Sequence, residues 1–126
     1  MTRTKRPDEI REAAFLRDIV IEAEDVEEFT KDMKFVDFAA NRLVRKAVTK
    51  CLESIAEATK NLTPELKARH AGIAWKQMAG FRDFSAHHYW EMDYRIVWDI
   101  VRGHLPLLLV VVNAELAKVP EKPVTK

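Results

Sequence analysis

One short segment gathers most of the side chains in this sequence that could move a proton and bind an anion together. Histidine has an unperturbed pKa of about 6.5, so it can take up or release a proton near neutral pH. Arginine carries a permanent charge on a planar fork that can pair with two oxygens of a phosphoryl group. Both types occur within the eight residues Arg82-Asp83-Phe84-Ser85-Ala86-His87-His88-Tyr89. This segment is therefore the candidate site for acid–base chemistry beside a phosphate.

The spacing inside this segment limits how its two key residues can act together. Arg82 and His87 are five residues apart. On a continuous helix, five steps of about 100° place the two positions about 140° apart around the axis. Their side chains can then meet at one substrate only if the helix breaks between them or if a second subunit takes part.

The adjacent histidines also raise the question of a metal site. Neighbouring side chains point in different directions on a helix or a strand, so His87 and His88 do not face one ion together. His70 and His104 stand at no established ligand spacing from them. We therefore expect neither a metal nor a cofactor.

The order of residues in and around the segment resembles one known family. Arg82, His87 and Tyr89 form the pattern Arg-x4-His-x-Tyr, which HepT-like ribonucleases of the HEPN superfamily carry. Asp83 and His88 depart from that family, whose members commonly have asparagine and glycine at these places. The flanking elements follow the family's order over nearly the whole chain: Phe15-Leu16-Arg17-Asp18-Ile19, Glu28-Phe29-Thr30, Ile55-Ala56-Glu57-Ala58, Trp75, Met78-Ala79-Gly80, Asp93, Ile96-Val97-Trp98 and Leu105-Pro106.

The resemblance implies an all-α, up-and-down helical bundle of the HEPN type that works as a homodimer. It also implies a metal-independent endoribonuclease, the toxin of a toxin–antitoxin pair in bacteria or archaea. In such a site His87 is the general base that deprotonates a ribose 2′-hydroxyl, Arg82 stabilises the phosphoryl transition state, and Asp83 belongs to the catalytic set. The implied antitoxin is an MntA-type nucleotidyltransferase, which transfers AMP to the hydroxyl of Tyr89.

A second hypothesis makes the chain a non-catalytic helical adaptor that docks a nucleotidyltransferase and presents a substrate to it. The intact pair of Arg82 and His87 favours the enzyme, whereas Asp83 and the near-neutral charge favour the adaptor. Simpler roles for single residues also remain open. Arg82 could form an ion pair with a neighbouring carboxylate, and Tyr89 could be a core aromatic whose hydroxyl is hydrogen-bonded.

Two charged groups outside the segment could bind partners. A basic stripe with steps of three and four residues could track RNA phosphates or could simply be a solvated helix face. An acidic group could dock the antitoxin or could likewise be a solvated face. The stripe consists of Arg42, Arg45, Lys46 and Lys50, and the acidic group of Glu22, Glu24, Asp25, Glu27 and Glu28.

The elements that must position the segment follow from apolar periodicity and capping residues. Phe35 and Phe38 should plug the turn between the first two helices, and Gly103 should end the helix that follows the segment. Pro106 at a first-turn position favours a helix over a strand for the valine-rich run after it. Helices are predicted over residues 8–29, from the N-cap Asn41 to residue 60, from the N-cap Thr63 onward, over residues 75–84, over residues 93–101 and from residue 105.

Length and composition limit the number of domains, the possible partners and the cellular compartment of the chain. Its 126 residues fit one domain, with flexible ends at residues 1–7 and 119–126. With 21 Lys and Arg against 20 Asp and Glu, the net charge of +1 gives no global attraction to nucleic acid. A single cysteine, Cys51, excludes an internal disulfide and fits a reducing cytoplasm, where we interpret it as an inert small hydrophobe. The longest apolar run, residues 105–112, is too short to span a bilayer, and the apolar surplus around it favours a dimer interface. Trp90 and Trp98 are interpreted as core residues or as anchors of that interface.

Overall fold

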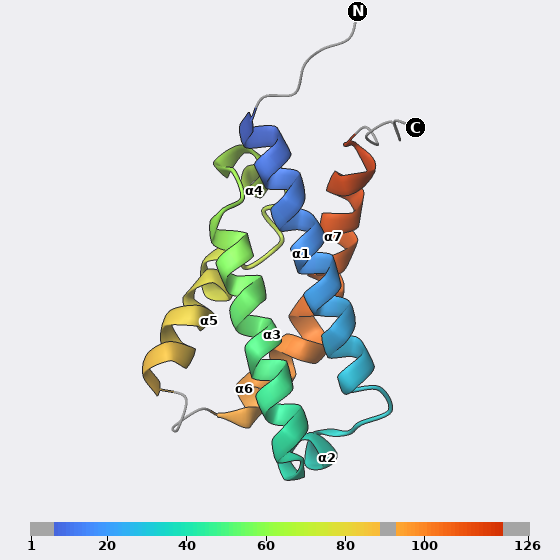
Figure 1. Cartoon of the computed structure of the whole chain (residues 1–126). Coiled ribbons are helices and arrows are strands. Elements are labelled where there is room, and N and C mark those ends of the chain that lie inside the picture. The colour runs from blue at the N-terminus through green and yellow to red at the C-terminus, as the bar shows by residue number, and fades with distance from the viewer. Residues whose placement is uncertain (1–6, 89–92, 120–126) are drawn as a thin grey trace, which may run out of the picture.

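The structure is a computed structural model that describes residues 7–88 and 93–119. For residues 7–8 and 82–88 it describes the backbone alone. All regular elements in these ranges are helical, so the expected all-α fold is confirmed. The elements are α1 (Pro7–Phe29), α2 (Phe35–Ala40), α3 (Arg42–Lys60), α4 (Pro64–Arg69), α5 (Trp75–His88), α6 (Tyr94–Asp99), the π-helical turn η2 (Ile100–His104) and α7 (Leu105–Ala117), as Figure 1 shows.

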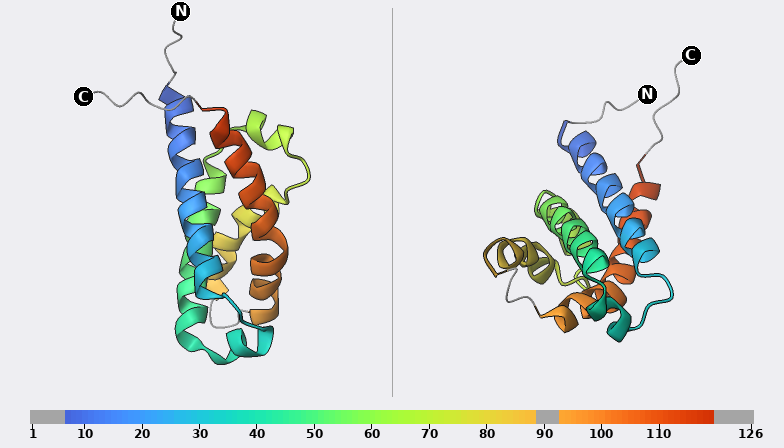
Figure 2. Two further views of the ribbon diagram at one scale, coloured as in Figure 1. Left: turned by 90° about the vertical axis from the view of Figure 1, so that its right-hand side faces the viewer. Right: turned by 60° about the horizontal axis from the view of Figure 1, so that its bottom comes forward.

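The long helices form an up-and-down bundle. Helix α1 packs between α3 and α7, and α3 packs between α1 and α5 (Figure 1). The start of α1 and the end of α7 lie at the same end of the bundle (Figure 2). We call the side where α1 packs against α7 the closed side, and the side where α5 faces α6 and η2 the open side.

The core forms where the apolar stripes of α1 and α3 meet. The buried residues of these two helices follow the predicted three- and four-residue spacing. At one end of the bundle Phe38 is completely buried, and its ring centroid lies 5.1 Å from that of Trp98. The main buried residues of the two helices are Leu16, Ile19, Ala23 and Val26 of α1 and Val48, Cys51, Leu52 and Ile55 of α3.

The predicted helix starts are confirmed by their caps. The Asn41 side chain accepts a hydrogen bond from the Val44 amide at 3.0 Å, and the Thr63 hydroxyl accepts one from the Leu66 amide at 3.2 Å. The segment around Phe38 was predicted only as a plugged turn, whereas it forms the short helix α2. A side chain that reaches back explains this start, since the Asp37 carboxylate accepts a 2.9 Å hydrogen bond from the Lys34 amide.

The prediction that Gly103 ends a helix is wrong. Gly103 lies inside η2, which joins α6 to α7 as one helix of 24 residues from Tyr94 to Ala117. In η2 the Leu105 amide donates to the Ile100 carbonyl, five residues back. Pro106 explains the wider turn, because a proline inside a helix lacks a donor and clashes with the carbonyl four residues before it.

This continuous helix is longer than the apolar run that the sequence suggested. Its most apolar 18-residue window has a mean hydropathy of 1.5, so by length and composition alone it could cross a membrane. One third of that window, 33%, is buried inside the protein. Arg102 also donates to the carbonyls of Thr30 and Met33 at 2.8 and 2.9 Å, which ties η2 to the end of α1. In this fold the helix therefore acts as one member of the bundle.

Candidate active site

The predicted catalytic residues lie on the second half of α5. Arg82, Asp83 and His87 are part of this helix, which extends four residues beyond the predicted end at Phe84. Their side chains, and Tyr89 and Trp90 altogether, lie outside the described residues. The described backbone of α5 is an unbroken helix between positions 82 and 87, which therefore lie about 140° apart around its axis. A helix break therefore does not bring the two positions together.

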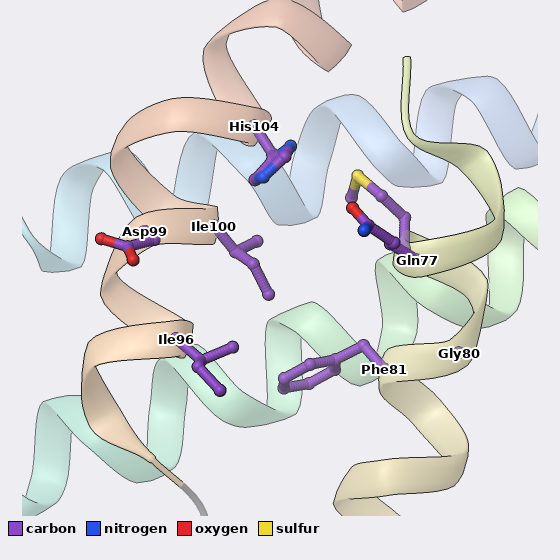
Figure 3. A pocket seen from close by; sticks show the side chains of 8 residues that line it. Gln77, Gly80, Phe81, Ile96, Asp99, Ile100 and His104 are labelled. Carbon is purple, nitrogen blue, oxygen red and sulfur yellow. The ribbon is translucent and has the colours of Figure 1, made fainter.

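A cavity of about 460 Å³ lies on the open side of the bundle, between the first part of α5 and the α6–η2 segment. Four apolar side chains and three polar ones surround it, and Phe81 of its wall directly precedes Arg82 in the chain. Figure 3 shows the Phe81 ring and the side chains of Ile96 and Ile100 extending into the space between the two helices. The lining residues are Gln77, Met78, Gly80, Phe81, Ile96, Asp99, Ile100 and His104.

A second, smaller cavity of about 220 Å³ continues this opening toward the start of α5. It shares Met78 and His104 with the first cavity and is otherwise lined by small and apolar residues. Its other lining residues are Gly72, Ile73, Ala74, Gly103 and Leu107. The open side therefore has space along the whole length over which α5 faces η2.

The start of α5 is fixed by hydrogen bonds from one aromatic side chain. The Trp75 indole nitrogen donates to the carbonyls of Lys67 and His70 at 3.1 and 3.0 Å. Helix α5 itself makes its main contact with α3. The helix that carries Arg82 and His87 is therefore held at its start and along one side.

A buried carboxylate on α7 holds the loop that precedes α5. Glu115 is 5% exposed, and its oxygens accept hydrogen bonds from the Arg69 guanidinium at 2.8 and 3.3 Å and from the Lys118 ammonium at 3.2 Å. The His70 ring nitrogen lies 2.5 Å from the same carboxylate. These partners, Arg69 foremost, lower the pKa of Glu115 to about 2 against the opposing effect of burial.

This carboxylate group did not emerge from the sequence analysis. The available signal was one glutamate within an otherwise apolar helix, with Lys118 three residues after it. A charge in such a run needs partners when it is buried. Its distant partners Arg69 and His70 could not be paired with it from spacing.

The predicted basic stripe divides into residues with different surroundings. Arg42 and Lys46 are exposed on α3. The Arg45 guanidinium lies 4.5 Å from the Tyr94 ring centroid and also donates to the Ala39 carbonyl. Lys50 lines a groove whose other charged residues are all carboxylates, namely Asp18, Glu22, Glu53 and Glu57. Binding of RNA by the stripe stays a prediction.

One group among the described residues could hold a metal ion by position alone. Ligand atoms of Glu22, Asp25 and Cys51 lie within 4.8 Å of one another. Burial, followed by a hydrogen bond with Glu22, raises the pKa of the Cys51 thiol to about 12. The interpretation of Cys51 as a buried small residue is confirmed, and its lack of reactivity stays a prediction.

Comparison with protein families shows to which family the chain belongs. The family model described as "Ribonuclease HepT-like" matches residues 19–115. The chain belongs to the HepT-like ribonuclease family. The resemblance seen in the Arg-x4-His-x-Tyr pattern and its flanking residues is thereby confirmed, and the all-α bundle agrees with it.

Individual relatives of this HepT-like chain come from archaea and bacteria. It is 42% identical over 93 residues to "Putative RNase MJ0127" of Methanocaldococcus jannaschii, covering 74% of this chain and 77% of that protein. It is 38% identical over 94 residues to "Probable ribonuclease HepT" of Thermococcus cleftensis, covering 75% and 86%. "Putative RNase TTE0752" of Caldanaerobacter subterraneus is 36% identical, with 75% and 84% covered. No solved structure matches the chain significantly.

Proposed function

We propose that this HepT-like protein is a metal-independent endoribonuclease whose site is built from Arg82, Asp83 and His87. The observation that carries the proposal is the presence of Arg82 and His87 on one helix of a chain that belongs to a ribonuclease family. The cavity beside Phe81 supports it, because it leaves space for a substrate next to that helix.

The proposed reaction uses RNA as its own nucleophile. His87 as a neutral imidazole takes the proton of a ribose 2′-hydroxyl, and the oxygen attacks the adjacent phosphorus. The bond from phosphorus to the 5′-oxygen breaks, that oxygen takes a proton from water, and His87 returns its own proton to solvent. The products are a 2′,3′-cyclic phosphate and a 5′-hydroxyl. Arg82 pairs with the phosphoryl oxygens while negative charge gathers there, and Asp83 contributes a polar group next to it.

The proposal includes a homodimer. On the unbroken α5 the positions of Arg82 and His87 lie on different faces, so two copies facing each other would bring both residue types to a shared cleft. Leu107 and Val110 on α7 are 57% and 69% exposed, which is typical of apolar residues that a partner covers. Two symmetric copies would bury the same face of each chain.

The proposal also includes a cytoplasmic toxin–antitoxin role. The antitoxin would be a nucleotidyltransferase of the MntA type that transfers AMP to Tyr89, two residues after His87. A nucleotide at this place adds bulk and negative charge, so it would exclude RNA. The Tyr89→Phe variant should cleave RNA but escape control by the partner. Intact-mass measurement after incubation with partner, ATP and magnesium should show added AMP on wild type only, and the same addition on the Phe variant would contradict this role.

The catalytic assignment is tested by single substitutions at Arg82 and His87. We expect Arg82→Ala and His87→Ala each to lower the rate of RNA cleavage by about 100- to 10,000-fold, because each removes charge stabilisation or proton transfer. Circular dichroism should show an unchanged fold, and EDTA should leave the wild-type rate unchanged. The control is Arg11→Ala, an exposed arginine of α1. Cleavage that survives in both variants of purified protein would overturn the assignment and favour the adaptor hypothesis.

A further inference from the structure

The larger cavity on the open side has the size and the lining of a ligand site. Its volume of about 460 Å³ lies within the range of roughly 300–1,000 Å³ that small-molecule sites occupy. Its walls are apolar, from Met78, Phe81, Ile96 and Ile100. Met78 and Phe81 are only 6% and 7% exposed, whereas Ile96 is 52% exposed and supplies more of the accessible apolar wall. A site of this kind binds a ligand with an apolar face and a polar edge.

The polar side chains of the cavity define what that edge must be. Gln77 of α5 and His104 of η2 extend from opposite helices toward the same end of the cavity (Figure 3). Neither side chain makes a hydrogen bond within the part of the chain that the structure describes. An amide and a neutral imidazole each offer both a donor and an acceptor. The ligand edge should therefore carry donors and acceptors side by side.

The described lining residues offer no cation to a phosphate that enters the cavity. Neither lysine nor arginine occurs among the described residues that line it. Asp99, whose carboxylate points outward at the rim in Figure 3, would repel an anion. A flat, neutral ring with a hydrogen-bonding edge fits these walls, and a nucleobase is such a ring.

The π-helical turn contributes directly to this cavity. Ile100 and His104 are the first and last residues of η2, and both line the cavity. Single π turns inside α-helices are frequent at functional sites. Here the turn brings one apolar and one polar side chain to the same space, which supports a binding role for the cavity.

We propose that the cavity is a nucleobase-binding subsite for single-stranded RNA, with the base packed against the apolar wall that includes Ile96 and Ile100 and its edge read by Gln77 and His104. The inference rests on the proposed ribonuclease function and deepens it. Phe81 and His87 are six residues apart on α5, which places them about 9 Å apart along the axis and about 120° apart around it. Recognition of unpaired RNA bases commonly combines contacts to the flat face of the base with hydrogen bonds to its edge.

The test fills the cavity from a position where the fold tolerates a side chain. A Cβ added at Gly80 would meet nothing within 4 Å, so Gly80→Leu places its side chain in open space at the cavity. The matched control is Ala68→Leu, an exposed position on α4 outside the cavity. The substrates are a short RNA that wild type cleaves and a series of copies, each lacking the base at one nucleotide.

In wild type, removal of the base at one nucleotide near the cleaved bond should lower kcat/KM about 10-fold, because the contacts of that base with the cavity are lost. Gly80→Leu should lower kcat/KM for the intact RNA by a similar factor and lose the difference between intact and abasic substrates. Ala68→Leu should behave as wild type. Unchanged kcat/KM and retained abasic sensitivity in Gly80→Leu would overturn the subsite.

Binding measurements separate this inference from the proposed function. The affinity of Arg82→Ala for the intact and abasic RNA should still differ, and adding Gly80→Leu should remove that difference even without cleavage. If no RNA is cleaved but this difference is found, the nuclease proposal fails and the subsite stands. If Gly80→Leu instead converts a dimer to a monomer in sedimentation, a second copy occupies the cavity and the subsite proposal is wrong.

Discussion

The closed and open sides of the bundle differ in what fills the space between their helices. On the closed side, Leu105, Leu108 and Val112 of α7 are completely buried, and Arg102 and Glu115 bond to distant parts of the chain. On the open side, Ile96 is 52% exposed and the helices are separated by two connected cavities. The completely buried residues of α7 and these long-range bonds thus lie on the closed side, whereas the open side keeps space between α5 and the α6–η2 segment.

The largest expected difference between the two sides comes from matched truncations to alanine. Leu108→Ala should lower the free energy of unfolding by about 2–5 kcal/mol, since it removes buried atoms and leaves a hole in a packed core. Ile96→Ala removes the same number of carbons from a half-exposed site and should cost less than about 1 kcal/mol. Urea unfolding followed by circular dichroism measures both. Equal losses would mean that the open side is as tightly packed in solution as the closed side.

A second expected effect concerns the buried carboxylate of the closed side. Its pKa of about 2 lies below the ordinary value of 4.5, so ionised Glu115 stabilises the folded state above about pH 5, and this contribution is lost as pH falls toward 2. Glu115→Gln should therefore destabilise the protein at pH 7 by about 2 kcal/mol, because the guanidinium of Arg69 loses its charged partner.

The pH dependence of the stability of Glu115→Gln tests whether the charge of Glu115 is what stabilises the fold. The difference in unfolding free energy between wild type and Glu115→Gln should shrink steadily between pH 5 and pH 2 in urea titrations, because only wild type loses a charge there. Glu27→Gln, on the exposed face of α1, serves as the control. A constant difference over this range would show that Glu115 stabilises the fold through its shape alone.

A smaller effect is expected where η2 meets the end of α1. Arg102 bonds two carbonyls and its guanidinium lies 4.4 Å from the Trp98 ring centroid. Arg102→Lys keeps the charge but replaces the planar fork, so we expect a loss of about 1–2 kcal/mol in thermal or urea unfolding. Arg42→Lys, at an exposed position, should change stability far less. Similar values for both would remove Arg102 from the contacts that distinguish the closed side.

The smallest effect should have the opposite sign and lie on the open side. Gly80 is an exposed helical residue, and a Cβ there meets nothing within 4 Å. Gly80→Ala should raise the free energy of unfolding by about 0.5–1 kcal/mol, because alanine loses less backbone entropy in a helix. Destabilisation on urea unfolding would show that the cavity wall is closer to Gly80 than the open side implies.

Short-range signals account for the parts of the fold that the sequence predicted well. The caps Asn41 and Thr63 and the spacing of apolar residues on α1 and α3 act within a few residues, so they can be read directly from the chain. The short helix α2 was missed because its start depends on one side chain, Asp37, which reaches back to the Lys34 amide. The prediction that Gly103 ends a helix failed because tertiary packing outweighs the low helix propensity of glycine at this position.

The candidate site was predicted from a sequence motif instead of from helix periodicity. The pattern of Arg82, His87 and Tyr89 is visible in the sequence, and the family match supports it over residues 19–115. The cavity beside Phe81 and the partners of Glu115 depend on residues far apart in the chain. Local periodicity does not show which helices leave a cavity between them or which distant charges form an ion pair. These features could therefore be found only in the folded structure.

The π turn also affects which insertions and deletions the fold can tolerate. One residue added to or removed from an α-helix turns everything beyond it by about 100°. Elsewhere between Tyr94 and Ala117, such a change would rotate the buried face of α7 away from α1. Within residues 100–104, loss of one residue can be absorbed by tightening the π turn to an α turn. Length variation among relatives should therefore concentrate at this turn.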